Sequence, residues 1–235
     1  MSFQERQKNY ARVAGAALLT IILSGALSNH LVVWSDAEAT ARNLIVHERQ
    51  FRIGLAGELL MLNADIVLAL AFYMLLKPVG TGLALLGAFW RLANAFLIAA
   101  GVIAGVVAVD VLTDPHLSAA LATFSAGQRP ALVLLFLDLH VTAMTVGLLP
   151  FSLGAATHSW LLWRSRYIPR VLSGAYFVAA AVLFAGAGAI LLLPRLDAVI
   201  DPWFILPDFA VELLAALWLL IRAVRISDPQ PEGAA

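Results

Sequence analysis

The sequence predicts an all-α fold: an integral membrane bundle of six transmembrane helices, with a short amphipathic interfacial helix after the first span. Hydrophobic residues make up 62% of the 235 residues and charged residues only 13%, about half the charged share of an average soluble domain. A water-soluble fold of this size needs more charge to cover its surface. The apolar residues also gather into runs of about 20, the length that crosses the hydrocarbon core as a helix. The strict apolar and polar alternation of a membrane β-barrel is missing.

Six apolar runs are long enough to span a bilayer, and they form one membrane domain over residues 1–226. The runs cover residues 13–34, 53–76, 82–112, 131–163, 171–193 and 203–224. The third and fourth are longer than one crossing needs, so we expect tilt, protruding ends or a break at Pro150. Residues 227–235 follow as a disordered tail.

The connections between the runs differ in character. Residues 35–38, Ser-Asp-Ala-Glu, have the pattern of a capping box, which opens a helix. Leu44 and Ile45 then stand among charged residues, so this helix is expected to lie on the membrane surface. Residues 77–80, Lys-Pro-Val-Gly, predict a tight turn between the second and third runs. Residues 113–129 carry no clear pattern.

Lys and Arg are unevenly divided among the connections. With a cytoplasmic N-terminus, nine lie inside, namely Arg6, Lys8, Arg12, Lys77, Arg164, Arg166, Arg170, Arg222 and Arg225. Five lie outside, namely Arg42, Arg49, Arg52, Arg129 and Arg195. This bias predicts a multi-pass protein of a bacterial inner (cytoplasmic) membrane with both termini cytoplasmic. The alternative is a secretory signal cleaved near Ala26-Leu27-Ser28, which would leave five spans and reverse the bias.

Charge and cysteine content exclude several classes of function. The 15 basic residues balance 15 acidic ones, and no basic stripe for nucleic acid is present, so no nucleic-acid partner is expected. The absence of cysteine excludes disulfides, thiolate metal ligands and a cysteine nucleophile. The sequence indicates no particular cofactor.

The candidate ligand or proton site consists of ionisable residues inside the apolar runs, because a charge at membrane depth is costly unless it is paired or faces water. The candidates are Glu58, Asp65, Arg91, Asp138, His140 and Glu212. Asp65 and Arg91 each lie 13 residues from Pro78. At about 1.5 Å per residue both are roughly 20 Å from the turn, so they are predicted to form an ion pair near mid-bilayer. The alternative for this pair is a packing device that fixes helix register.

Glu58, His140 and Glu212 are predicted to share one layer, about 10 to 15 Å from the outer ends of their helices. One imidazole and two carboxylates suit zinc, manganese or iron, although no metal spacing motif is present. The same groups could instead relay protons. Asp138 points about 200° away from His140 around the helix, so it faces a different neighbour. Asp208 is expected at the membrane interface, and His158 near a span end, in solvent.

Several short strings, taken in order, resemble the bacterial membrane family known as domain of unknown function 4386. The strings are Tyr10-Ala11-Arg12, Phe51-Arg52-Ile53-Gly54, Leu76-Lys77-Pro78-Val79, Phe89-Trp90-Arg91-Leu92, Leu135-Phe136-Leu137-Asp138-Leu139-His140 and Ser165 through Pro169-Arg170. The resemblance runs from about Tyr10 to Arg225 and implies acids at the positions of Glu58, Asp65 and Glu212. Many members have a second histidine where this chain has Gly154, which argues against a two-histidine metal site. The family brings no activity, so the resemblance supports the fold and the residue set.

Three functions therefore remain open. The first is a protein that binds a small molecule or lipid, with Arg91 meeting an anionic group and the carboxylates coupling to protons. The second is an intramembrane enzyme, in which Glu58, His140 and Glu212 hold a metal or act as acid and base. The third is an accessory or assembly subunit whose polar residues only hold the helices together. The expected partners are the lipid bilayer, such a ligand, and a second copy of the chain or another membrane subunit.

Overall fold

Helices are the only regular secondary structure in the described part of the computed structural model, which confirms the all-α prediction there. The structure describes residues 2–25, 31–125, 127–193 and 203–224. The helices are α1 (Phe3–Gly25), α2 (Ala37–Val46), α3 (Glu48–Thr113), α4 (Pro115–Ala120), α5 (Gln128–Ser165), α6 (Arg170–Leu192) and α8 (Leu206–Ile221). The alternative cleavage site at 26–28 and the predicted tail at 227–235 lie outside the described residues.

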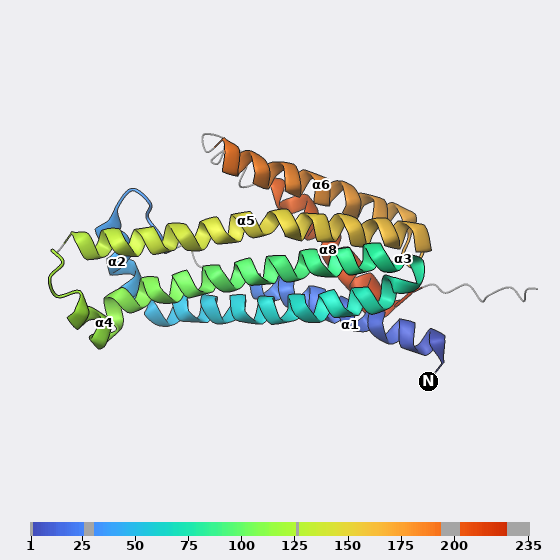
Figure 1. Ribbon diagram of the computed structural model, residues 1–235, viewed down its shortest axis with the longest axis horizontal. Helices are drawn as coiled ribbons and strands as arrows, with labels where there is room; N and C mark the ends of the chain where they lie inside the picture. Colours follow the sequence, from blue (N-terminus) through green and yellow to red (C-terminus); the bar gives the residue numbers. More distant parts are fainter. Residues whose placement is uncertain (1, 26–30, 126, 194–202, 225–235) are drawn as a thin grey trace, which may run out of the picture.

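α3 is a helical hairpin. Its backbone leaves the helical conformation at Gly80 (φ −178°, ψ 93°), two residues after Pro78. Proline lacks the N–H that continues a helix and its ring clashes with the preceding turn. Residues 48–79 and 81–113, here called the first and second halves of α3, consequently run side by side in opposite directions (Figure 1). The turn predicted at residues 77–80 is confirmed.

In the described part of the chain three helices, α3, α5 and α6, are long and apolar enough to cross a membrane by length and composition. Their outward faces carry exposed apolar side chains, among them Leu70, Phe96 and Leu135. α5 continues without interruption through Pro150, so the expected break is not observed. Its 38 residues would extend about 57 Å, well beyond a hydrocarbon core of about 30 Å.

Two short helices follow side-chain caps. α2 is capped by Asp36, whose Oδ1 accepts a hydrogen bond from the Ala39 N–H at 2.8 Å. The predicted capping box began at Ser35, one residue before the observed N-cap, Asp36. Aspartate caps a helix as well as serine does. α4 lies in the segment that showed no clear pattern. It begins at Pro115 after Asp114, which caps the Leu117 N–H at 2.8 Å, and this Asp-Pro order is a recognised helix start.

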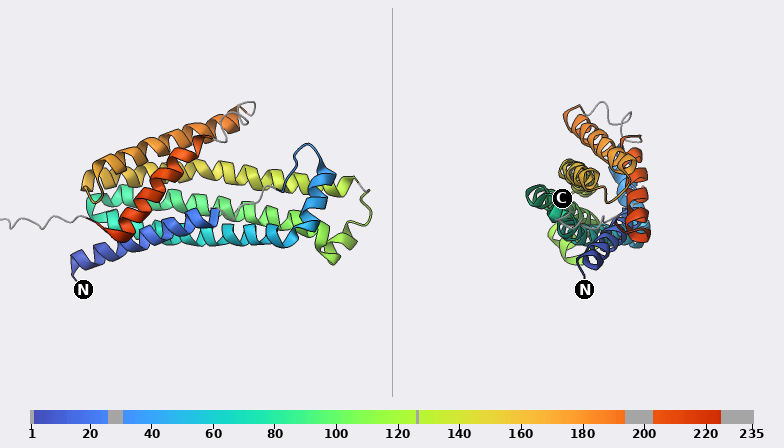
Figure 2. Two further views of the ribbon diagram at one scale, coloured as in Figure 1. Left: turned by 180° about the vertical axis from the view of Figure 1, so that it is seen from behind. Right: turned by 90° about the vertical axis from the view of Figure 1, so that its right-hand side faces the viewer.

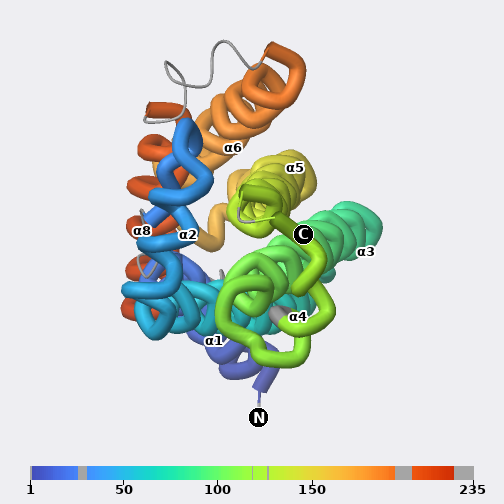
Figure 3. Tube along the Cα trace, turned by 90° about the vertical axis from the view of Figure 1, so that its left-hand side faces the viewer, coloured from blue at the N-terminus to red at the C-terminus, as the bar shows by residue number. Residues whose placement is uncertain are grey.

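The long helices form one bundle in which α5 packs against both α3 and α6, and α1 packs against both α3 and α8. Figure 3 shows α5 in the middle of the bundle, and Figure 2 shows α8 crossing it obliquely. α1 approaches α8 at Gly15, where a Cβ atom would lie 2.7 Å from the carbonyl oxygen of Ala216. The start of α1, the α3 turn and the α5–α6 connection lie at the same end (Figure 1).

Candidate functional site

Arg91 is the centre of a buried charge cluster. Its side chain has no exposed surface, and its Nη1 lies 3.1 Å from Oδ1 of Asp65. Its Nη2 donates a hydrogen bond to Oε1 of Glu212 at 3.2 Å. The two halves of α3 carry Asp65 and Arg91, whereas Glu212 comes from α8. The ion pair predicted between Asp65 and Arg91 is therefore present, and it has a third member.

Two neutral polar side chains add hydrogen bonds to the cluster, while Nε of Arg91 has no hydrogen-bond partner among the described residues. Asn94 Nδ2 donates to Oδ2 of Asp65 at 2.8 Å. The Tyr176 hydroxyl, on α6, donates to Oε1 of Glu212 at 2.7 Å, and Tyr176 is fully buried. The Arg91 guanidinium carbon also lies 4.3 Å from the centre of the Phe151 ring. The cluster therefore ties α3, α5, α6 and α8 together.

Asp208 adds a third carboxylate that has no partner of its own. It lies four residues before Glu212 on α8, its residue is only 4% exposed, and its Oδ1 accepts no hydrogen bond. Within the described part of the chain no ion pair reaches Asp208. The charge of Arg91 is thus set against three buried carboxylates. Because uncompensated buried charge is strongly unfavourable, the cluster has the capacity to take up protons or a cationic group.

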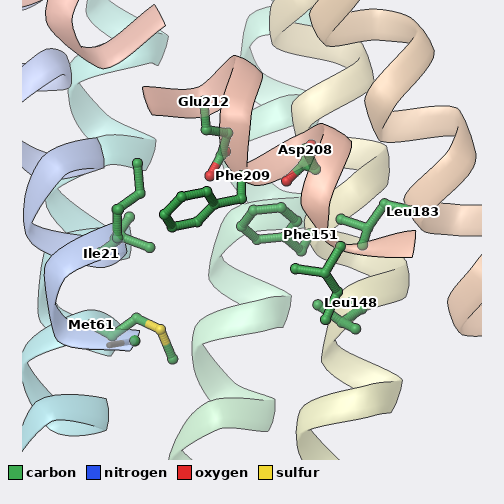
Figure 4. A pocket seen from close by; sticks show the side chains of 11 residues that line it. Ile21, Met61, Leu148, Phe151, Leu183, Asp208, Phe209 and Glu212 are labelled. Carbon is green, nitrogen blue, oxygen red and sulfur yellow. The ribbon is translucent and has the colours of Figure 1, made fainter. Parts of the chain in front are cut away.

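A cavity of about 350 Å³ borders this cluster. Its walls are mostly apolar side chains of α1, α3, α5, α6 and α8, and among the described residues Asp208 and Glu212 are the only ionisable ones that line it. Figure 4 shows the two carboxylates beside the rings of Phe209 and Phe151, with Ile21 across the cavity. The arrangement offers a polar spot on an otherwise apolar wall.

A separate polar pair joins α3 to α5. His140 Nε2 lies 3.4 Å from Oε1 of Glu58, and both side chains are about 15% exposed. The other ring nitrogen, Nδ1, lies 2.8 Å from the carbonyl oxygen of Gly101. Since a carbonyl only accepts, Nδ1 carries the hydrogen of this bond, and Nε2 is left facing the Glu58 carboxylate. This pair is able to hold a proton.

The predicted layer of Glu58, His140 and Glu212 is wrong. Glu212 contacts Arg91 and Tyr176, while Glu58 and His140 contact each other. Among the described residues no group of three or more His, Cys, Asp or Glu side chains is placed to hold a metal ion. The metal site proposed from the sequence is corrected accordingly, because Glu212 lies at the level of Arg91 and Asp65, about 10 Å along the helix from Glu58. Asp138 is exposed and joins neither group.

Three further residues were misjudged or missed. Asp208, expected at the interface, lines the cavity. His158, expected in solvent, is fully buried with its ring 4.5 Å from that of Phe72. The four-residue spacing of Asp208 and Glu212 places both on one helix face. This spacing could have identified Asp208 as a site residue from the sequence. Tyr176 had no comparable signal.

A bundle with long apolar helices around buried ionisable groups defines the class: a helical protein suited to a membrane. Within this class, the sequence profile described as Domain of unknown function (DUF4386) matches residues 13–223. The chain belongs to this family, and the resemblance found in the sequence is confirmed. No curated protein and no solved structure matches the chain significantly.

Proposed function

We propose that this chain is a six-span protein of a bacterial cytoplasmic membrane that binds an amphiphilic small molecule or lipid in the cavity beside Asp208 and Glu212. The head group of this ligand is cationic and donates hydrogen bonds. The observation that carries the proposal is the buried, unpartnered Oδ1 of Asp208 on the wall of an apolar cavity.

The six-span topology draws support from the hairpin in α3. Its two halves, with α1, α5, α6 and α8, supply six helices within one bundle. The start of α1, the α3 turn and the α5–α6 connection share one end (Figure 1), as alternating crossings require. The excess of Lys and Arg in the connections at that end favours a cytoplasmic location for both termini.

The chemistry of the cavity selects the ligand. A volume of about 350 Å³ is at the small end of the roughly 300–1,000 Å³ found for ligand sites. A buried acceptor left without a partner costs about 1–3 kcal/mol, which a donor on the ligand would recover. A cationic head would also offset the excess of carboxylates over Arg91. When the cavity is empty, protons on the carboxylates offset this negative charge instead.

The structure changes the role first expected for Arg91. Its guanidinium is already bound by Asp65 and Glu212, and it is not among the lining residues. An anionic head group would have to displace one of these carboxylates and would meet Asp208. Arg91 therefore holds Glu212 in position, and the carboxylates meet the ligand.

Thermal unfolding of the full chain in nanodiscs tests the proposal with two probes of equal chain length, dodecylamine and dodecyl sulfate. Saturating dodecylamine should raise the melting temperature of the wild type by about 5 °C, because a ligand that binds only the folded state stabilises it. Dodecyl sulfate should not. The Asp208→Asn variant should lose the shift, whereas Asp138→Asn, which neutralises an exposed carboxylate on α5, should keep it. An equal shift with dodecyl sulfate, or a full shift in Asp208→Asn, would contradict the proposal.

A further inference from the structure

A second hollow of about 350 Å³ lies between α5 and α6. Trp160 and Trp163 of α5 and Phe177 and Val178 of α6 form most of its wall. These four side chains are 40% to 61% exposed. The hollow is therefore an open apolar groove with aromatic walls.

Gly174 allows the Trp163 ring, which forms one wall of the groove, to pack directly against the α6 backbone. A Cβ atom at this position would lie 2.5 Å from Cζ3 of Trp163, so any larger residue would displace that ring. The rings of Trp160 and Phe177 lie 6.3 Å apart and frame the other part of the groove. The shape suits a flexible apolar chain.

Three arginines stand where the groove meets the α5–α6 connection. The guanidinium of Arg170 lies 6.0 Å from the centre of the Trp163 ring, and Arg164 and Arg166 are close by in the chain. All three are exposed. Residues 159–178 include no Asp or Glu, and no ion pair to these arginines is found in the described ranges of the chain. The groove thus ends at an uncompensated positive charge.

We propose that this groove binds an anionic phospholipid. One acyl chain lies against Trp160, Trp163 and Phe177, and the phosphate is held by Arg170 with added attraction from Arg164 and Arg166. Guanidinium groups bind phosphate through charged, paired hydrogen bonds, and the apolar groove accounts for the chain. This site is separate from the cavity beside Asp208 and does not depend on what that cavity binds.

Native mass spectrometry of the detergent-solubilised full chain tests the site with dioleoyl phosphatidylglycerol and dioleoyl phosphatidylcholine, which differ only in the head group. The anionic lipid should bind at least tenfold more tightly. Arg170→Gln should weaken it about fivefold and the triple variant with Arg164→Gln and Arg166→Gln about a hundredfold, since each basic residue near a lipid surface contributes about a fivefold factor. Arg12→Gln, which removes an exposed arginine from α1, is the matched control and should have no effect.

The groove itself is tested by Val178→Trp, a change at a 61% exposed position that fills the hollow from its open side. This variant should weaken both lipids at unchanged melting temperature, and glycerol 3-phosphate, a head group without chains, should bind far more weakly than the lipid. Equal binding of the two lipids by the wild type would overturn the proposal. So would unchanged binding in Arg170→Gln or in folded Val178→Trp, or head-group binding as tight as that of the lipid.

Discussion

Asp208 and Glu212 lie four residues apart on α8 and border the same apolar cavity, but only Glu212 is bound by Arg91. One carboxylate is thus held in place by Arg91 and Tyr176, while the other has an oxygen without a hydrogen-bond partner among the described residues. This asymmetry separates a structural role, carried by Glu212, from a binding role, carried by Asp208.

Arg91→Ala tests the structural role of the cluster. The change leaves Asp65 and Glu212 buried without their counter-ion, and removing one partner of a buried ion pair typically costs about 3–5 kcal/mol. Chemical unfolding in detergent measures the loss. Arg42→Ala breaks the exposed pair with Glu38 and should cost less than about 1 kcal/mol. Equal stability of the two variants would show that the cluster does not hold the helices together.

Tyr176→Phe removes the hydroxyl that donates to Glu212 but keeps the ring. A hydrogen bond to a charged group contributes about 1.5–3 kcal/mol, so the free energy of unfolding should fall by that amount. Tyr73→Phe, at a partly buried tyrosine of α3, is the control and should change it little. A Tyr176→Phe variant as stable as the wild type would mean that Glu212 is satisfied by Arg91 alone.

Gly15→Ala tests the close approach of α1 to α8. The added methyl would lie 2.7 Å from both the Ala216 carbonyl oxygen and the Leu220 nitrogen, and because backbone atoms cannot move aside cheaply, overpacking should cost about 1–3 kcal/mol. Gly188→Ala on α6 meets nothing within 4 Å and should instead stabilise its helix by up to about 1 kcal/mol. The two melting temperatures should therefore move in opposite directions, and a rise in both would contradict the observed α1–α8 contact.

Glu58→Gln tests whether Glu58 and His140 together hold a proton. The amide carries no negative charge to stabilise a protonated imidazole, so the His140 ring should shift from the doubly protonated toward the singly protonated form. The ring ¹⁵N chemical shifts of His140 report this change directly. Asp138→Asn, two residues away on an exposed face, should leave them unchanged. Identical His140 shifts in the wild type and Glu58→Gln would show that the pair shares no proton.

The sequence predicted the Asp65–Arg91 ion pair because both residues lie equally far from Pro78. Asp65 and Arg91 lie on consecutive helix halves joined by a tight turn, so equal spacing from Pro78 fixes equal depth, and the ion pair follows. No such relation joins Glu212 to Glu58 and His140, which are far apart in the chain. The depth of Glu212 was counted along α8 as if that helix ran parallel to the others, but α8 crosses the bundle obliquely (Figure 2), and Glu212 lies beside Arg91 and Asp65 instead of Glu58.

The positions of Asp208 and His158 depended on packing that periodicity does not contain. Asp208 stands in the first turn of α8, where an interfacial location was expected. However, α8 crosses the bundle obliquely (Figure 2), and Asp208 is buried against the cavity while its neighbours Leu206 and Phe209 stay exposed. His158 is covered by Phe72 and by Gly87, where a Cβ atom would lie 2.6 Å from Nε2 of the imidazole. Both outcomes follow from the crossing and spacing of helices, which the fold class leaves undetermined.

We propose that the cavity beside Asp208 binds both the head and the chain of a cationic amphiphile. Photolabelling of the full chain in nanodiscs with a dodecylamine that carries a diazirine on its chain, followed by mapping of the labelled residues, tests where such a ligand lies. Labelling should concentrate on cavity residues such as Ile21, Leu148 and Phe209, and it should disappear from them in Asp208→Asn. Labelling spread evenly over the lipid-facing sides of the helices, or unchanged in Asp208→Asn, would contradict the claim.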